Sequence, residues 1–111
     1  MISVIEKEDF TEYDFSREDL EGKTFHRCIF VNAKFDFANC ADAVFTDCDL
    51  TKASFKGTRC NNAEFKQSRL NQAPFIGANL FAARSISCQM LACTLEESKL
   101  LGADFAACNL T

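Results

Sequence analysis

The sequence predicts a solenoid built from a five-residue unit, and three observations support this. Every fifth residue from Phe10 to Leu110 belongs to one class that is almost entirely Phe or Leu, and it holds ten of the twelve Phe of this 111-residue chain. The position two residues before each of them is small at every step from Cys28 to Cys108. The other three positions of each unit carry nearly all the charged and amide side chains. A period of five fits neither a helix nor a strand, so the chain must turn at a fixed interval.

The chain is predicted to be one domain, residues 1–111, because no Pro/Gly-rich linker divides it. Residues 1–9 contain Ile2, Val4 and Ile5, and we expect them to form a short cap strand that covers the open edge of the first coil. Residues 10–111 hold the repeats. The start of the chain lacks the pattern of a secretion signal, and no apolar run reaches the roughly 20 residues of a membrane span.

The two inward positions of each unit are expected to fill a narrow tube. A large residue and a small residue alternate with polar ones, and such side chains must interdigitate because a packed interior tolerates little change in volume. The three outward positions then form the whole surface of the molecule.

Three stretches, Ala78-Asn79-Leu80, Ala103-Asp104-Phe105 and Cys108-Asn109-Leu110, resemble the A(D/N)LXX signature of pentapeptide-repeat proteins. The resemblance covers residues 8–111 and implies an all-β fold, a right-handed quadrilateral β-helix of about five coils, with four five-residue sides in each coil of 20 residues. Residues 20 apart would then stack. The expected core ladders are Phe15, Phe35, Phe55 and Phe75 on one side, and Phe25, Phe45 and Phe65, resuming at Phe105, on another.

All seven Cys lie in the inward columns, and we interpret them as small buried residues in a reducing compartment. This predicts a cytoplasmic location. Pairs such as Cys28 and Cys48 should be vertical neighbours, but the spacing of stacked coils is wider than a relaxed disulfide prefers.

The sequence predicts neither a catalytic site nor a cofactor or metal site. His26 is the single histidine and is expected to point outward next to Phe25. No zinc-type Cys/His spacing and no phosphate-binding glycine loop occurs. A tube filled with side chains also offers no cavity for a substrate. The protein is therefore predicted not to be an enzyme.

The net charge of −4 is unevenly distributed. Residues 1–21 hold eight acids and two bases, a net charge of −6, whereas the remainder has a net charge of +2. Two interpretations stay open, a solvated surface that keeps the rod soluble and an acidic surface for a basic partner. The candidate acidic partner surface consists of Glu8, Asp9, Glu12, Asp14, Glu18, Asp19 and Glu21. The third coil is basic, with Lys52, Lys56, Arg59, Lys66 and Arg69 around one acid, Glu64.

Apolar residues also occupy outward positions late in the chain, and contiguous apolar patches often mark interfaces. Solenoid ends normally carry capping units, yet no capping signal precedes Thr111. We therefore expect the last coil to be covered by a partner, by a second copy in a homodimer through the C-terminal end, or by residues that follow Thr111. The candidate apolar interface consists of Ile76, Phe81, Leu91 and Leu101.

Ser85 breaks the Phe ladder between Phe65 and Phe105. Two outcomes are open, a void at Ser85 or a local register slip that turns Ile86 inward. Because a void of this size costs several kcal/mol, the slip is the favoured prediction.

The opening, from Glu8-Asp9-Phe10 to Cys28-Ile29-Phe30, resembles quinolone-resistance proteins of the Qnr type, a subgroup of pentapeptide-repeat proteins. That resemblance implies binding to DNA gyrase and topoisomerase IV as a DNA mimic, with protection from quinolones or toxins and no direct contact with nucleic acid. The alternative is a rigid protein–protein interaction scaffold, because solenoids commonly present an extended face to a protein partner.

Overall fold

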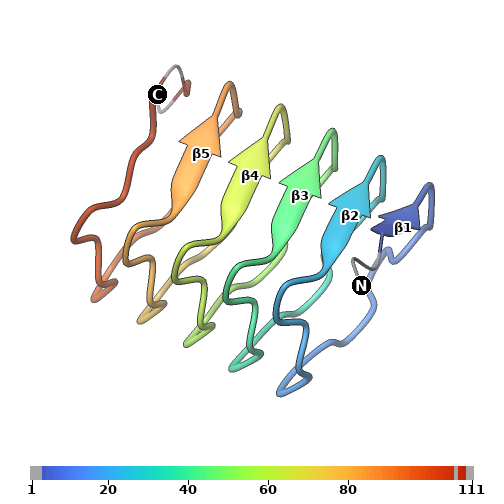
Figure 1. Ribbon diagram of the computed structural model, residues 1–111, viewed down its shortest axis with the longest axis horizontal. Coiled ribbons are helices and arrows are strands. Elements are labelled where there is room, and N and C mark those ends of the chain that lie inside the picture. The colour runs from blue at the N-terminus through green and yellow to red at the C-terminus, as the bar shows by residue number, and fades with distance from the viewer. Residues whose placement is uncertain (1–3, 107, 110–111) are drawn as a thin grey trace.

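The computed structural model describes residues 4–106 and 108–109 as short parallel strands joined by turns. The strands are β1 (Val4–Glu6), β2 (Thr24–His26), β3 (Val44–Thr46), β4 (Glu64–Lys66) and β5 (Arg84–Ile86). They form one sheet in sequence order, and each residue pairs with the one 20 positions later, as Val4 does with Thr24 (Figure 1). Nothing in the described part of the chain is a helix with the length and apolarity of a membrane span.

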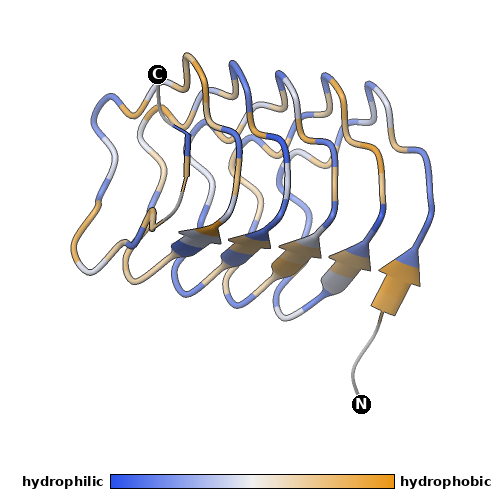
Figure 2. Cartoon of the chain, turned by 90° about the horizontal axis from the view of Figure 1, so that it is seen from above, coloured by the Kyte–Doolittle hydropathy of each residue, from blue (hydrophilic) through white to orange (hydrophobic). Residues whose placement is uncertain are grey.

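Each coil has four sides. The strands form face 1, and the other sides, faces 2, 3 and 4 in chain order, pair through single bridges with the same offset, as at Asp9–Ile29, Asp14–Lys34 and Asp19–Asn39. The coils lie side by side along the rod, with the strands on one side of it (Figure 2). This arrangement confirms the predicted tube of four five-residue sides.

The chain turns tightly at the corners between faces. After face 2, the amide of Tyr13 donates to the carbonyl of Phe10 at 3.0 Å. The second corner residue takes a positive φ, 61° at Glu12 and 65° at Arg17, which few residues other than glycine adopt readily. Repeated corners of this kind impose the period of five that the sequence displays.

The interior confirms the predicted Phe ladders. Phe35 stacks on Phe55 with ring centroids 4.8 Å apart, and Phe55 stacks on Phe75 at 4.6 Å, with the planes within 5°. Phe55 also meets the neighbouring ladder edge-on, 5.7 Å from Phe65. Offset-stacked and edge-to-face pairs are the favoured aromatic geometries. Phe105, in the last coil, is only half-buried.

Side chains at the small positions point back towards the preceding coil. This direction explains which residue is the first of the small column. A polar side chain at such a position reaches back to the carbonyl 23 residues earlier, as Thr58 Oγ1 does to Phe35 at 2.6 Å and Ser68 Oγ does to Phe45 at 3.3 Å. The side chain therefore occupies the space inside the preceding coil. Residue 28 is the first for which such a preceding coil exists, and the run of small residues starts at Cys28.

Five residues on face 2 use this direction to donate hydrogen bonds. Each donates to a carbonyl of face 1 in the coil before, with Sγ or Oγ to oxygen distances of 3.0–3.5 Å. Burial raises the pKa of Cys48 to about 12, so its thiol keeps the proton that it donates. The cysteines are therefore weak hydrogen-bond donors as well as small core residues. The five residues are Cys28, Cys48, Ser68, Cys88 and Cys108.

The predicted register slip at Ser85 is wrong. Ser85 pairs with Phe65 in the regular register, is 3% exposed, and Ile86 stays at the corner, half-buried. The backbone explains this: the amide of Ser85 donates to Asp104 at 2.8 Å, and a slip would break the ladder on both sides of the coil. Keeping these bonds outweighs the loss of one ring from the stack.

The N-terminal strand forms, but it belongs to the first coil itself. β1 pairs with β2 in the common register, and Ile5 lies opposite Phe25 at a centre position. The repeat thus starts before residue 10, where the sequence analysis placed it. Ile2 and Leu110 lie outside the described residues.

Phe37 is an exposed corner residue between faces 3 and 4. Its ring lies between Arg17 of the coil before and Gly57 of the coil after. The guanidinium carbon of Arg17 lies 5.1 Å from the ring centroid. On the other side, a Cβ atom added to Gly57 would come within 2.5 Å of the ring. The absence of a side chain at Gly57 therefore makes room for the aromatic ring.

We expect Gly57→Ala to lower the free energy of unfolding by about 2 kcal/mol, from the positive φ and from displacement of the Phe37 ring. Gly77→Ala is the matched control, because Gly77 has a similar φ of +66° and nothing within 4 Å of an added Cβ. It should cost about 1 kcal/mol. Urea denaturation of both variants, alone and with Phe37→Ala, measures the difference. Equal losses for the two alanines would contradict a role for the ring.

Candidate interaction surfaces

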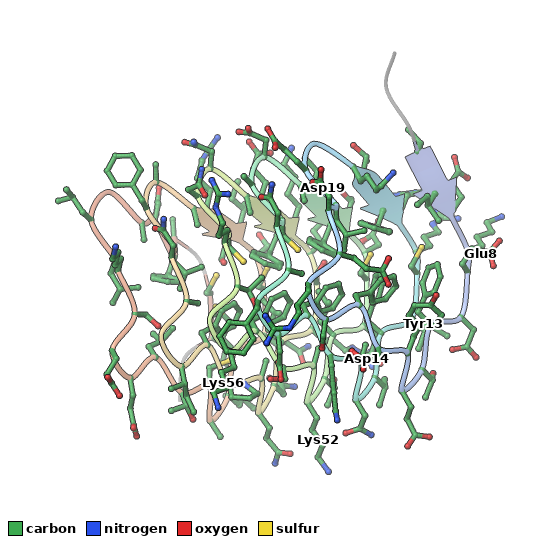
Figure 3. All side chains as sticks on the ribbon, turned by 90° about the horizontal axis from the view of Figure 1, so that it is seen from below. Glu8, Tyr13, Asp14, Asp19, Lys52 and Lys56 are labelled. Atoms are coloured by element: carbon green, nitrogen blue, oxygen red, sulfur yellow. The ribbon has the colours of Figure 1, made fainter. Side chains whose placement is uncertain are left out.

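The predicted acidic residues form a ring around the first coil, which we call the acidic ring. All seven are exposed, and they lie on faces 2, 3 and 4 and on the corners that follow faces 2 and 4. Figure 3 labels Asp14 and Asp19 among the side chains of the rod, with Glu8 at the end next to β1. The structure therefore brings these carboxylates into one band. The acidic ring consists of Glu8, Asp9, Glu12, Asp14, Glu18, Asp19 and Glu21.

The three Asp of the acidic ring are held in place by the corners. The Asp9 carboxylate accepts the amide of Thr11 at 2.9 Å, and the Asp14 carboxylate accepts that of Ser16 at 2.9 Å. Hydrogen bonds from the side chain and then the amide of Thr11 lower the pKa of Asp9, and Ser16 lowers that of Asp14 in the same way. The carboxylate of Asp19 accepts the amide of Glu21 at 3.1 Å, so all three Asp side chains are oriented by hydrogen bonds.

The basic residues Lys52, Lys56, Arg59, Lys66 and Arg69 form a second band, which we call the basic band and which spans the third and fourth coils. They lie on different sides of the tube, and Lys66 and Arg84 share Glu64, with nitrogen–oxygen distances of 3.1 and 3.9 Å. Exposed pairs of this kind contribute little to stability. The charge therefore changes sign along the rod rather than between its faces.

The candidate apolar residues do not form one patch. Phe81 and Leu101 occupy equivalent positions in successive coils, on the corner between faces 4 and 1, and are 47% and 77% exposed. Ile76 is half-buried on the corner between faces 3 and 4, and Leu91 is half-buried on the corner between faces 2 and 3. The corner of Leu91 is diagonally opposite that of Phe81. Of the four candidate residues, Phe81 and Leu101 share one corner, and we call this pair the ridge.

The last coil is less buried than those before it. Leu80 is 2% exposed, whereas Leu100, its equivalent one coil later, is 41% exposed. Leu95 and Phe105 are half-buried. The C-terminal end of the tube therefore shows the edges of its core residues to solvent.

The described residues form no pocket and contain no cluster of three or more His, Cys, Asp or Glu side chains with metal-site geometry. His26 lies at the end of β2 and is half-buried. Cysteines in the described part of the chain are free thiols, and burial raises the pKa of Cys40 to about 12.

Comparison with known proteins agrees with this description. The family model for pentapeptide repeats matches eight copies, over residues 28–59 and 43–81. A search of curated protein sequences finds no match.

Among solved structures, HetL, a pentapeptide-repeat protein involved in heterocyst differentiation regulation in the cyanobacterium Nostoc sp. strain PCC 7120, is similar with a TM-score of 0.83 and 15% identity. It matches 90% of this chain and 48% of its own, so the chain spans about half the length of HetL.

Two further structures share the fold. A pentapeptide-repeat protein from the Arabidopsis thaliana thylakoid lumen has a TM-score of 0.83 and 24% identity, over 88% of this chain and 68% of its own. QnrB1, a plasmid-mediated fluoroquinolone resistance protein, has a TM-score of 0.55 and 22% identity, over 96% of this chain and 70% of its own. The repeat, the four-sided coil and these matches together establish that the chain belongs to the pentapeptide-repeat family.

Proposed function

We propose that this protein is a non-enzymatic scaffold whose acidic ring binds a basic protein surface that otherwise holds DNA, with DNA gyrase and topoisomerase IV as the candidate partners. The observation that carries the proposal is the acidic ring itself, seven exposed carboxylates on one coil. The similarity of residues 8–30 to the opening of Qnr-type proteins and the shared fold of QnrB1 support this choice of partner.

The carboxylates suit a surface that binds phosphates. Duplex DNA presents a dense row of negative charge, and its partners bind largely through Lys and Arg. Because Asp9 and Asp14 are fixed by hydrogen bonds, these two carboxylates lose little side-chain entropy on binding.

The distribution of charge also specifies how the partner is approached. A mimic that lies lengthwise along a DNA-binding groove needs acids along its whole length, whereas this rod is basic over residues 52–69, in its third and fourth coils. The first coil, with the edges next to it, is therefore the part that enters the basic surface. The basic band would be repelled from the same surface and would orient the rod.

A supercoiling assay with gyrase, with and without ciprofloxacin, tests the proposal. We expect the protein to inhibit supercoiling or to restore it in the presence of the drug. Glu12→Lys/Glu18→Lys/Glu21→Lys should weaken this effect about tenfold, equivalent to about 1.4 kcal/mol. The control Asp42→Lys/Asp47→Lys/Glu97→Lys reverses three exposed acids outside the acidic ring and should act like the unchanged protein. If the unchanged protein has no effect in either arm, gyrase is not the partner.

A second function, a scaffold for a different protein partner, is favoured by the ridge of Phe81 and Leu101. A side chain that is 77% exposed, as Leu101 is, gains apolar burial when a partner covers it. The ridge is continuous with the exposed edge of Leu100, so the homodimer through the C-terminal end belongs to the same proposal. Sedimentation velocity over a concentration series distinguishes the homodimer from a complex with another protein, since a dimer changes its mass without added partner.

We propose a cytoplasmic location, supported by the seven cysteines.

A further inference from the structure

Both ends of the rod carry edges of the same backbone ladder. Between coils, a centre amide donates forward, as Phe10 does to Ile29 at 2.7 Å, and the next coil donates back, as Ile29 does to Glu8 at 2.9 Å. At the C-terminal end, the amides of Leu95 and Leu100 form no hydrogen bond within the described residues. The end that shows these amides also shows the edge of the Leu100 side chain.

The N-terminal edge is complementary to the C-terminal edge. Asp14 and Asp19 bridge only to the coil after them, so the side of their backbone that would pair with a preceding coil faces the end of the rod. Because every coil uses the same ladder and the same offset, a second copy placed with its C-terminal end here could continue the ladder by one more coil. Unpaired strand edges are the usual route by which β-proteins associate, and a head-to-tail contact of this kind builds an open chain of molecules.

Four side chains stand in the way of this contact. In later coils the small positions hold residues such as Ala33 and Ala38, fully buried, whose side chains point into the coil before. In the first coil, and at the residue that follows it, the same positions hold large side chains. Side chains with the same direction point towards the N-terminal end of the rod, where the described residues form no preceding coil. These residues are Glu8, Tyr13, Glu18 and Lys23.

The contacts of Tyr13 show where its side chain lies. Its ring centroid is 4.4 Å from that of Phe15 and 5.8 Å from that of Phe10, both residues of its own coil, and Tyr13 is 49% exposed. Tyr13 thus covers the core at the N-terminal end without entering the coils behind it. Glu8 lies at the same end of the rod, next to β1 (Figure 3).

We propose that Glu8, Tyr13, Glu18 and Lys23 form an end block that prevents a second copy of this chain from stacking its C-terminal end on the first coil. In a stacked pair these side chains would enter the interior of the partner's last coil. There, two carboxylates and one ammonium group would lose their water, at a cost of several kcal/mol for each isolated ion. The phenol ring would also need space where later coils hold only Ala or Cys.

The end block explains how the first coil can keep a regular, unpaired backbone edge, which otherwise favours association. The first coil keeps the regular ladder up to its edge, and the Phe10 ring stacks on Phe30 as in the interior, with centroids 5.2 Å apart. The backbone edge of the first coil is therefore open to pairing within the described residues, and in this proposal the side chains of the end block prevent the pairing. Association through two C-terminal ends is unaffected by the block, so assembly would stop at a dimer.

The test is the mass of the 111-residue chain in sedimentation velocity and light scattering over a concentration series, with negative-stain electron microscopy of the same samples. We expect the unchanged protein to stay at or below the mass of a dimer. Glu8→Ala/Tyr13→Ala/Glu18→Ala/Lys23→Ala should form species larger than a dimer that grow with concentration and appear as rods with a continuous axis. The control Glu6→Ala/Lys7→Ala/Glu12→Ala removes the same charges from exposed outward positions of the first coil and should behave like the unchanged protein.

A second substitution identifies the partner surface. Leu100→Glu places a charge on the C-terminal end, and when combined with the four alanines it should return the mass to that of the unchanged protein. Circular dichroism and thermal unfolding check that each variant is folded. Should the four alanines prevent folding, Glu8→Gln/Glu18→Gln removes the two negative charges with little change in shape and should assemble partially.

Three results would overturn the end block: a folded variant that keeps the mass of the unchanged protein at every concentration, assembly of the control to the same extent, or assembly that persists with Leu100→Glu. The readout does not involve gyrase, so the outcome is independent of the proposed function.

Discussion

Phe55→Ala is expected to lower the free energy of unfolding by about 3–5 kcal/mol, the range for a large aromatic residue removed from a packed core. Phe55 is fully buried and stacks on both neighbours of its ladder, Phe35 at 4.8 Å and Phe75 at 4.6 Å. Removal therefore breaks two stacked pairs and leaves a cavity in the middle of the rod. Urea denaturation followed by circular dichroism measures the change.

Phe37→Ala is the matched control for this loss. Phe37 is 50% exposed, and its contact with Arg17 contributes about 0.5–1 kcal/mol. A loss at Phe55 no larger than that at Phe37 would mean that the ladders do not support the fold. Because each coil contacts only its neighbours, Phe105→Ala in the half-buried last coil should cost less than Phe55→Ala.

Most of this fold follows from the sequence because the corners leave the chain little choice. Each unit of five must place its large and small inward residues inside a tube that has no other contents, so the pattern of Phe55 and Ala53 repeats with almost no exception. The same constraint predicted the ladders and the outward positions of Asp9 and Asp14. Both depend on position within the unit, which the sequence states directly.

The structure differs from the sequence predictions where the conformation depends on more than a residue's position in the five-residue unit. Ser85 kept its register because the backbone ladder outweighs the preference of one side chain, and the sequence shows only the side chain. Cys48 and Ser68 act as hydrogen-bond donors because their column points towards strand carbonyls, and this direction appears only in three dimensions. One signal was present: four of the five residues at this position of face 2 are Cys, whereas other faces hold mostly Ala.

The candidate surfaces were predicted less completely for the same reason. Outward residues are free of packing constraints, so their type does not show which corner they share. Leu91 and Phe81 are ten residues apart, which is half a coil, and they therefore lie on diagonal corners. The seven acids of the acidic ring lie in one band because they are close in sequence and belong to one coil. Their role as a partner surface stays a prediction.

Ala73→Glu should destabilise the fold by several kcal/mol, enough to unfold much of the population at 25 °C. Ala73 is fully buried at a small position of face 3, and its side chain points into the coil before. A carboxylate there would lose its water without gaining a partner. Thermal and urea unfolding of the purified variant measure the effect.

The neighbouring substitution Gln72→Glu adds the same charge one residue away, at an exposed corner position, and should change the free energy of unfolding by less than about 0.5 kcal/mol. Glu18 makes the contrast sharper, since it occupies the position on face 4 that corresponds to Ala73 on face 3, yet it is tolerated in the first coil. Position within the unit is the same in both, and the presence of a preceding coil is what differs. If Ala73→Glu were as stable as Gln72→Glu, the small column would not point into the tube, and the physical basis of the end block would be lost with it.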